Sequence, residues 1–130
     1  MLAAIRFRPY PEVPGVLRAL RQRGAAIVVV SNWDVSLHDV LERTGLRALV
    51  DAVVTSAELG VAKPDPAIFA EALALAGAAA DEAVHAGDSV EADVEGARAA
   101  GIEPVLVARD GERPPAGVRA IPTLAGLLAG

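Results

Sequence analysis

The feature that most constrains the fold is a series of short apolar runs that end in small polar residues. The run Ala26 to Val30 is rich in β-branched residues and too short for a helix, which predicts a strand buried on both faces of a sheet. Similar runs predict further strands at Ala52 to Thr55, Ala83 to Ala86 and Val105 to Val107. Because the stretches between these runs can hold crossover helices, the strands are expected to be parallel.

The stretches between the predicted strands carry apolar residues at helical spacing. In the first of them, Val13, Val16, Leu17 and Leu20 fall on one face, and Gly24 ends the pattern. The elements together predict an α/β fold, a doubly wound parallel sheet of at least four strands, formed by residues 1–130 as one domain. The other predicted helices cover residues 34–44, a segment starting at Pro66 behind an Asp65 cap, residues 90–100 and residues 123–128.

Composition excludes several classes of function. The formal net charge is −5 and the basic residues form no run, so a nucleic-acid partner is not expected. The chain has no cysteine, which excludes disulfides and thiolate chemistry. The longest apolar stretch is far shorter than the roughly 20 residues that span a bilayer, and no secretory signal is apparent. The expected location is therefore the cytoplasm, away from membranes.

Polar residues gather where the predicted strands end. Ser31 and Asn32, the only asparagine of the chain, follow the first strand, and Gly87, Asp88 and Ser89 follow the third. Ligands of open α/β sheets bind beyond the carboxyl ends of the strands. These positions therefore define a candidate site.

A lysine and two aspartates suggest what such a site could bind. Lys63 is the single lysine among 12 basic residues and lies in the loop from Gly60 to Pro66. It is a compact charge suited to an anion. Asp88 opens a helix directly after a strand, and Asp93 follows five residues later, so a shared role needs a turn between them. Hard oxygen ligands at such a point suit Mg²⁺ held together with phosphate.

Each residue taken alone has a simpler interpretation. Ser31 and Asn32 could cap the next helix, Lys63 could be a solvated charge, and Asp88 could be an N-cap near the helix dipole. His85 has no partner at a diagnostic spacing and is interpreted as structural. The combination and its order along the chain favour the functional interpretation.

The ordered segments Val28-Val29-Val30-Ser31-Asn32, Lys63-Pro64-Asp65-Pro66-Ala67-Ile68-Phe69 and His85-Ala86-Gly87-Asp88-Ser89, with Asp93 and Gly96-Ala97, resemble the haloacid dehalogenase superfamily of hydrolases. The resemblance covers residues 9–128. The Gly87-Asp88 pair in the last motif is similar to that of the Mg²⁺-dependent phosphatase branch of the superfamily. It implies that Ser31 bonds a phosphoryl oxygen with Asn32 shaping the site, and that Lys63 neutralises negative charge. It also implies that Asp88 binds Mg²⁺ and Asp93 supports the metal.

One motif of that superfamily is absent. Its first motif, an Asp-x-Asp that ends an N-terminal central strand, supplies the nucleophile and the general acid and base. No Asp-x-Asp occurs in this chain, whose first aspartate is Asp34. The segment from Met1 to Tyr10 is similar to the end of the cap region, so the Rossmann-like sheet is expected to be incomplete at its N-terminal strand. We expect Leu2 to Phe7 to fill the gap, a second subunit to cover it as a homodimer, or the strands to close up.

These observations support a hydrolase core, a phosphatase for a small phosphorylated metabolite, that is inactive alone because its nucleophile is absent. The alternative is a non-catalytic module that binds phosphate and Mg²⁺. A response-regulator receiver fits worse, because Thr55 stands where that fold needs an aspartate at the end of a strand. A dinucleotide-binding domain is excluded by the absence of Gly-x-Gly-x-x-Gly.

Overall fold

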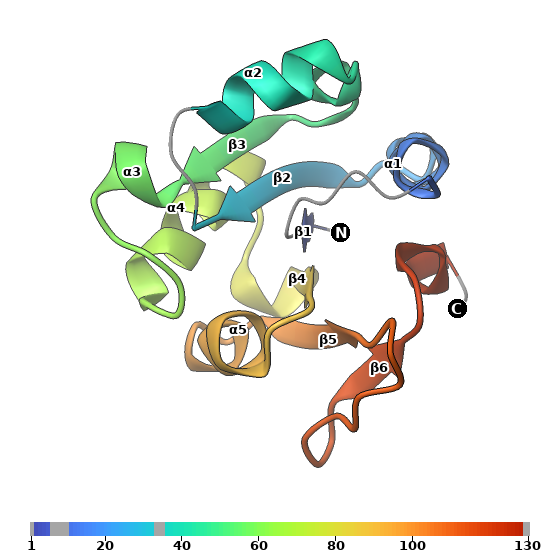
Figure 1. Ribbon diagram of the computed structural model, residues 1–130. Coiled ribbons are helices and arrows are strands. Elements are labelled where there is room, and N and C mark those ends of the chain that lie inside the picture. The colour runs from blue at the N-terminus through green and yellow to red at the C-terminus, as the bar shows by residue number, and fades with distance from the viewer. Residues whose placement is uncertain (1, 6–10, 33–35, 129–130) are drawn as a thin grey trace.

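The computed structural model describes residues 2–5, 11–32 and 36–128 of the chain. Its strands form one sheet in which every neighbouring pair is parallel, with the order β3-β2-β1-β4-β5-β6. Such an order requires crossover connections, which contain helices except between β5 and β6 (Figure 1). The strands are β1 (Leu2–Ile5), β2 (Ala26–Ser31), β3 (Ala52–Thr55), β4 (Ala83–Gly87), β5 (Glu103–Val107) and β6 (Arg119–Ile121).

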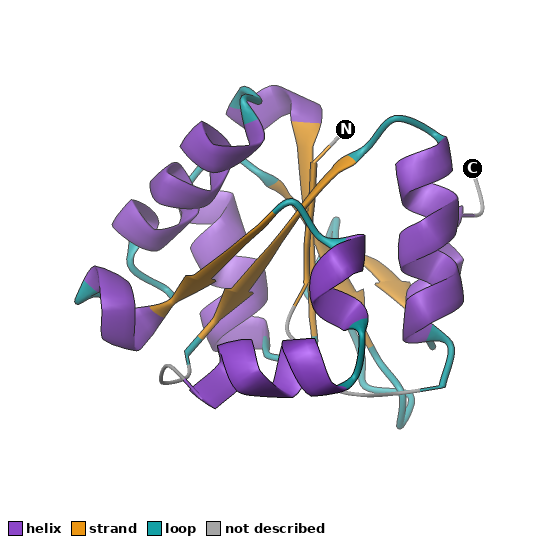
Figure 2. Ribbon diagram, turned by 90° about the horizontal axis from the view of Figure 1, so that it is seen from above, coloured by secondary structure: helices purple, strands orange, loops and turns teal. Residues whose placement is uncertain are grey.

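Helices lie on both faces of the sheet (Figure 2). One face packs against α1 (Val13–Gln22), whose four predicted apolar residues are all buried, and against α2 (Ser36–Arg43). The other face packs against α4 (Pro66–Ala76) and α5 (Gly96–Ala99). The predicted doubly wound α/β fold is confirmed. The remaining turns are η1 (Leu46–Leu49), α3 (Ser56–Leu59), η2 (Ala80–Glu82), η3 (Val90–Glu95) and η4 (Leu124–Leu128).

The central place in the sheet belongs to β1. Ile5 is in register with Val29 of β2 on one side and with Ala86 of β4 on the other. Residues 2–5 therefore fill the gap that the missing N-terminal motif led us to expect, and the sheet is continuous without a strand from a second copy. Residues 6 and 7 of the expected segment lie outside the described part of the chain.

Local sequence explains most of the helix ends. Gly24 follows α1 with a φ of 84°, a left-handed conformation that glycine adopts without steric cost. Asp65 caps α4 by accepting a hydrogen bond from the Ala67 amide at 2.9 Å. The predicted helix over 34–44 is α2, which begins at Ser36, and its proposed cap Asp34 lies outside the described residues.

The structure differs from the expected elements in two regions. The continuous helix expected over 90–100 is a π-helical turn, η3, followed by the single α-helical turn α5. Residues 119–121, for which no strand was predicted, form the edge strand β6. Both elements are too short for hydrophobic periodicity to distinguish them. Within the described residues, no helix is long and apolar enough to cross a membrane.

Candidate active site

The strand ends on either side of β1 bring the predicted residues to one edge of the sheet. Ile5 pairs with Val29 and with Ala86, so Ser31, which ends β2, and Asp88, which follows β4, lie at the same edge of the sheet on either side of β1. Ser31 is buried, at 4% exposure, whereas Asp88 is exposed. This edge is where ligands bind in open α/β sheets.

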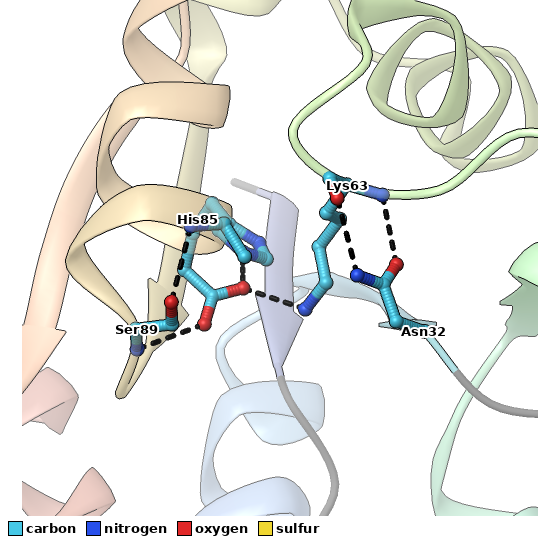
Figure 3. A network of polar contacts seen from close by, with 6 residues as sticks. Asn32, Lys63, His85 and Ser89 are labelled. Atoms are coloured by element: carbon cyan, nitrogen blue, oxygen red, sulfur yellow. Dashed lines mark hydrogen bonds and ion pairs between the residues drawn. The ribbon is translucent and has the colours of Figure 1, made fainter.

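Lys63 and Asp93 form a buried ion pair at this edge. Lys63 Nζ lies 2.6 Å from Asp93 Oδ1, and the two side chains are 2% and 1% exposed. Figure 3 shows the lysine side chain reaching from its loop toward the turn that follows β4. A buried charge of this kind requires a partner of opposite sign, so the two residues depend on each other.

Two further groups bind the Asp93 carboxylate. His85 Nε2 lies 2.9 Å from the same oxygen, Oδ1, while the Ser89 amide donates to Oδ2 at 3.1 Å. Burial by itself would raise the pKa of Asp93. The hydrogen bond from His85 and the positive charge of Lys63 outweigh burial and hold that pKa well below its ordinary value. Asp93 is therefore an anion with both oxygens engaged inside the protein.

The turn after β4 is shaped to place Asp93 there. A side chain on Gly87 would overlap the carboxyl group of Asp93, so only glycine leaves room for it. The wide turn of η3 then includes a hydrogen bond from the Val94 amide to the Ser89 carbonyl, five residues back, at 3.1 Å. The spacing of Asp88 and Asp93 required a turn between them for a shared role, and this π-helical turn is the one observed there.

Asn32 contacts Lys63 through the main chain. Its Oδ1 accepts a hydrogen bond from the Lys63 amide at 2.7 Å, and its Nδ2 donates to the Lys63 carbonyl at 3.1 Å (Figure 3). The residues at the end of β2 and in the lysine loop are thereby joined, although they are far apart in sequence.

Comparison with known proteins identifies the family to which this fold belongs. The model of the haloacid dehalogenase-like hydrolases matches residues 2–101. The chain belongs to that family. A solved relative of the same fold, a haloacid dehalogenase (HAD) phosphatase from Thermococcus onnurineus, superimposes with a TM-score of 0.85 and 32% identity over 91% of this chain and 55% of the other. The Rossmann-like HAD core is thus confirmed.

Relatives with curated descriptions cover the same region of this HAD-family chain. The haloacid dehalogenase-like hydrolase domain-containing protein 3 of Bos taurus is 50% identical over 71% of this chain and 37% of its own length. A phosphoserine phosphatase of Thermus thermophilus is 40% identical over 84% of this chain and 44% of its own length. The chain therefore spans less than half the length of these relatives.

The two aspartates after β4 in this HAD-family core differ in their exposure to solvent. Asp88 is exposed at the end of β4, whereas the oxygens of Asp93 already accept hydrogen bonds from Lys63, His85 and Ser89. Among the described residues, no group of three or more histidine, aspartate or glutamate side chains could hold a metal ion. Mg²⁺ is commonly held in proteins by one or two carboxylates together with waters and substrate phosphate, a set to which Asp88 could contribute one carboxylate.

Sequence reasoning missed one member of the network. His85 was expected to be structural, and it is fully buried, with its ring edge-on to Phe69 at 5.0 Å between centroids. Its Nε2 nevertheless belongs to the Lys63 and Asp93 cluster. Its position two residues before Gly87 places it on the same sheet face as the Gly87 and Asp93 contact, which is the signal that could have indicated this role.

Proposed function

We propose that the chain forms the core of a phosphatase for a small phosphorylated metabolite. The observation that carries the proposal is the buried Lys63 and Asp93 pair between the ends of β2 and β4. Phosphoryl transfer depends on positioning and on stabilising negative charge spread over oxygens. Relatives bear such names as phosphoserine phosphatase, glyceraldehyde 3-phosphate phosphatase and ribulose-1,5-bisphosphate 5-phosphatase, which supports this substrate class.

Each residue has a defined part in this proposal. The Ser31 hydroxyl bonds a phosphoryl oxygen, and the Lys63 ammonium, held at one side by Asp93, neutralises charge on the phosphate. Asp88 is the carboxylate that would hold Mg²⁺, which supplies positive charge to the phosphoryl oxygens when it is bound. Asp93 supports that position indirectly, because its Oδ2 accepts the hydrogen bond from the Ser89 amide, one peptide after Asp88.

The proposed mechanism lacks a nucleophile in this chain. An aspartyl-phosphate intermediate requires a nucleophilic carboxylate, yet the chain contains no Asp-x-Asp, and residues 2–5 of β1 carry no carboxylate. We therefore propose that this chain binds phosphate but does not complete the reaction by itself. The same observation favours a second candidate, a non-catalytic module that binds phosphate and Mg²⁺.

Binding and turnover measured together test these proposals. Binding of inorganic phosphate is measured by calorimetry with and without MgCl₂, and turnover is measured with p-nitrophenyl phosphate. We expect Mg²⁺-dependent phosphate binding without turnover, and loss of binding in Lys63→Met but not in Glu71→Gln, an exposed change on α4. Turnover that disappears in Asp88→Asn would show that the chain is a complete enzyme. Absence of phosphate binding in the unmodified chain would contradict both candidates.

A further inference from the structure

The carboxamide of Asn32 engages a single residue twice. It accepts from the main-chain amide of Lys63 and donates to the main-chain carbonyl of the same residue, at 2.7 and 3.1 Å. The Asn32 residue is exposed, yet both its side-chain oxygen and its side-chain nitrogen bind the lysine loop (Figure 3). The Asn32 carboxamide therefore binds the protein itself and not a ligand.

The two hydrogen bonds of Asn32 fix both the position and the orientation of the lysine loop. A carboxamide is planar and presents its acceptor and donor side by side, so two hydrogen bonds to one residue set both the position and the orientation of that backbone. The Lys63 side chain begins at this fixed point and ends at Asp93 Oδ1. Asn32 therefore fixes the backbone from which the Lys63 side chain begins, and Asp93 binds the ammonium at its end.

We propose that Asn32 is a positioning residue that acts through the Lys63 main chain. Its function is to hold the lysine loop against the end of β2 so that the Lys63 ammonium stays buried beside Asp93. The link to phosphate binding rests on the proposed function. The positioning itself is a property of the ligand-free protein and can be measured without a substrate.

The composition of the chain makes this measurement unambiguous. Lys63 is the only lysine, so acetylation by an N-hydroxysuccinimide ester at a side-chain amine reports on this residue alone, by peptide mass spectrometry. A buried ammonium reacts only when the loop opens. Loss of two hydrogen bonds in Asn32→Ala should increase the rate of Lys63 acetylation by about tenfold or more, while the variant remains folded.

A variant weakened elsewhere separates positioning from general destabilisation. Leu124→Ala removes a buried side chain from the opposite face of the sheet, and its acetylation rate is compared under conditions where both variants are equally far from unfolding. A rate in Asn32→Ala that equals that of the native chain or of Leu124→Ala overturns the proposal. A clear excess over both supports it.

Phosphate binding then distinguishes this inference from the proposed function. If acetylation accelerates in Asn32→Ala but the native chain binds no inorganic phosphate, the positioning role stands and the proposed function fails. If the native chain binds phosphate and Asn32→Ala leaves Lys63 as unreactive as before, the proposed function stands and the positioning role fails.

Discussion

The ammonium of Lys63 and the carboxylate of Asp93 lie 2.6 Å apart with almost no contact with solvent, although 30 residues separate them in the chain. The pair joins the loop after β3 to the turn after β4. Since the buried ammonium has no water to replace its partner, loss of Asp93 leaves Lys63 unpaired, whereas loss of Lys63 leaves Asp93 with the hydrogen bonds from His85 and Ser89.

Replacing one member of this pair should be strongly destabilising. Asp93→Asn removes the negative charge and leaves the buried ammonium unpaired, which costs about 3–5 kcal/mol in the free energy of unfolding. Urea denaturation followed by circular dichroism measures the change. The double variant Lys63→Met/Asp93→Asn should lose less than the sum of the two single variants. Additive losses would contradict the coupling.

Gly87 should not tolerate a side chain. In Gly87→Ala the new methyl group would overlap the Asp93 carboxyl, so we expect a lower free energy of unfolding and faster acetylation of Lys63. The matched control is Gly15→Ala in the first turn of α1, where a methyl group meets nothing within 4 Å. That change should be neutral or stabilising, because alanine favours a helix more than glycine does. Equal behaviour of the two variants would count against the proposed crowding.

Stability should fall in acid partly because of Asp51. The hydrogen bond from the Ile27 amide, with help from Arg21, lowers the pKa of Asp51 from its ordinary value of 3.8. A lowered folded-state pKa contributes stability above the ordinary value, and that contribution is lost as the pH falls below it. Urea midpoints measured between pH 7 and pH 3 should therefore decrease less in Asp51→Asn than in the native chain. The exposed change Asp81→Asn serves as the control, and identical slopes in all three proteins would refute the prediction.

Asp88 should govern the response to magnesium. Asp88→Asn removes the exposed carboxylate at the end of β4, so we expect the enhancement of phosphate binding by Mg²⁺ to fall by about tenfold or more. Calorimetry at fixed phosphate with increasing MgCl₂ measures this response, and Lys63 acetylation in the absence of metal should stay unchanged. An undiminished response to Mg²⁺ would remove Asp88 from the proposed metal site.

The parts of the fold that could be predicted are those with a strong periodic signal. β2 was predicted from Ala26 to Val30 and ends one residue later at Ser31, and β3 has the predicted bounds. Runs of β-branched residues buried on both faces leave little alternative to a central strand. The short edge strand β6 was not predicted, because Arg119–Ile121 has no room for an alternating pattern.

The sequence indicated several residues of the candidate site, but not which of them bind one another. Strand ends indicate which side chains meet at an edge, and Ser31, Asn32 and Asp88 were selected in this way. Lys63 was selected as the only lysine of the chain, and Asp93 by its spacing from Asp88. The use of Asn32 on a main chain 31 residues away depends on how the lysine loop folds back. The contact of His85 with Asp93 depends on the π-helical turn, whose extra residue per turn leaves no clear signature in the sequence.

The bridge from Asn32 through Lys63 to Asp93 and Ser89 passes from the end of β2 to the turn after β4, two strands that are not neighbours in the sheet. None of its members belongs to β1, the strand that lies between them. The separation between the carboxyl ends of β2 and β4 is thus held by contacts that lie outside the strand between them. These hydrogen bonds and the ion pair therefore do not depend on any residue of β1.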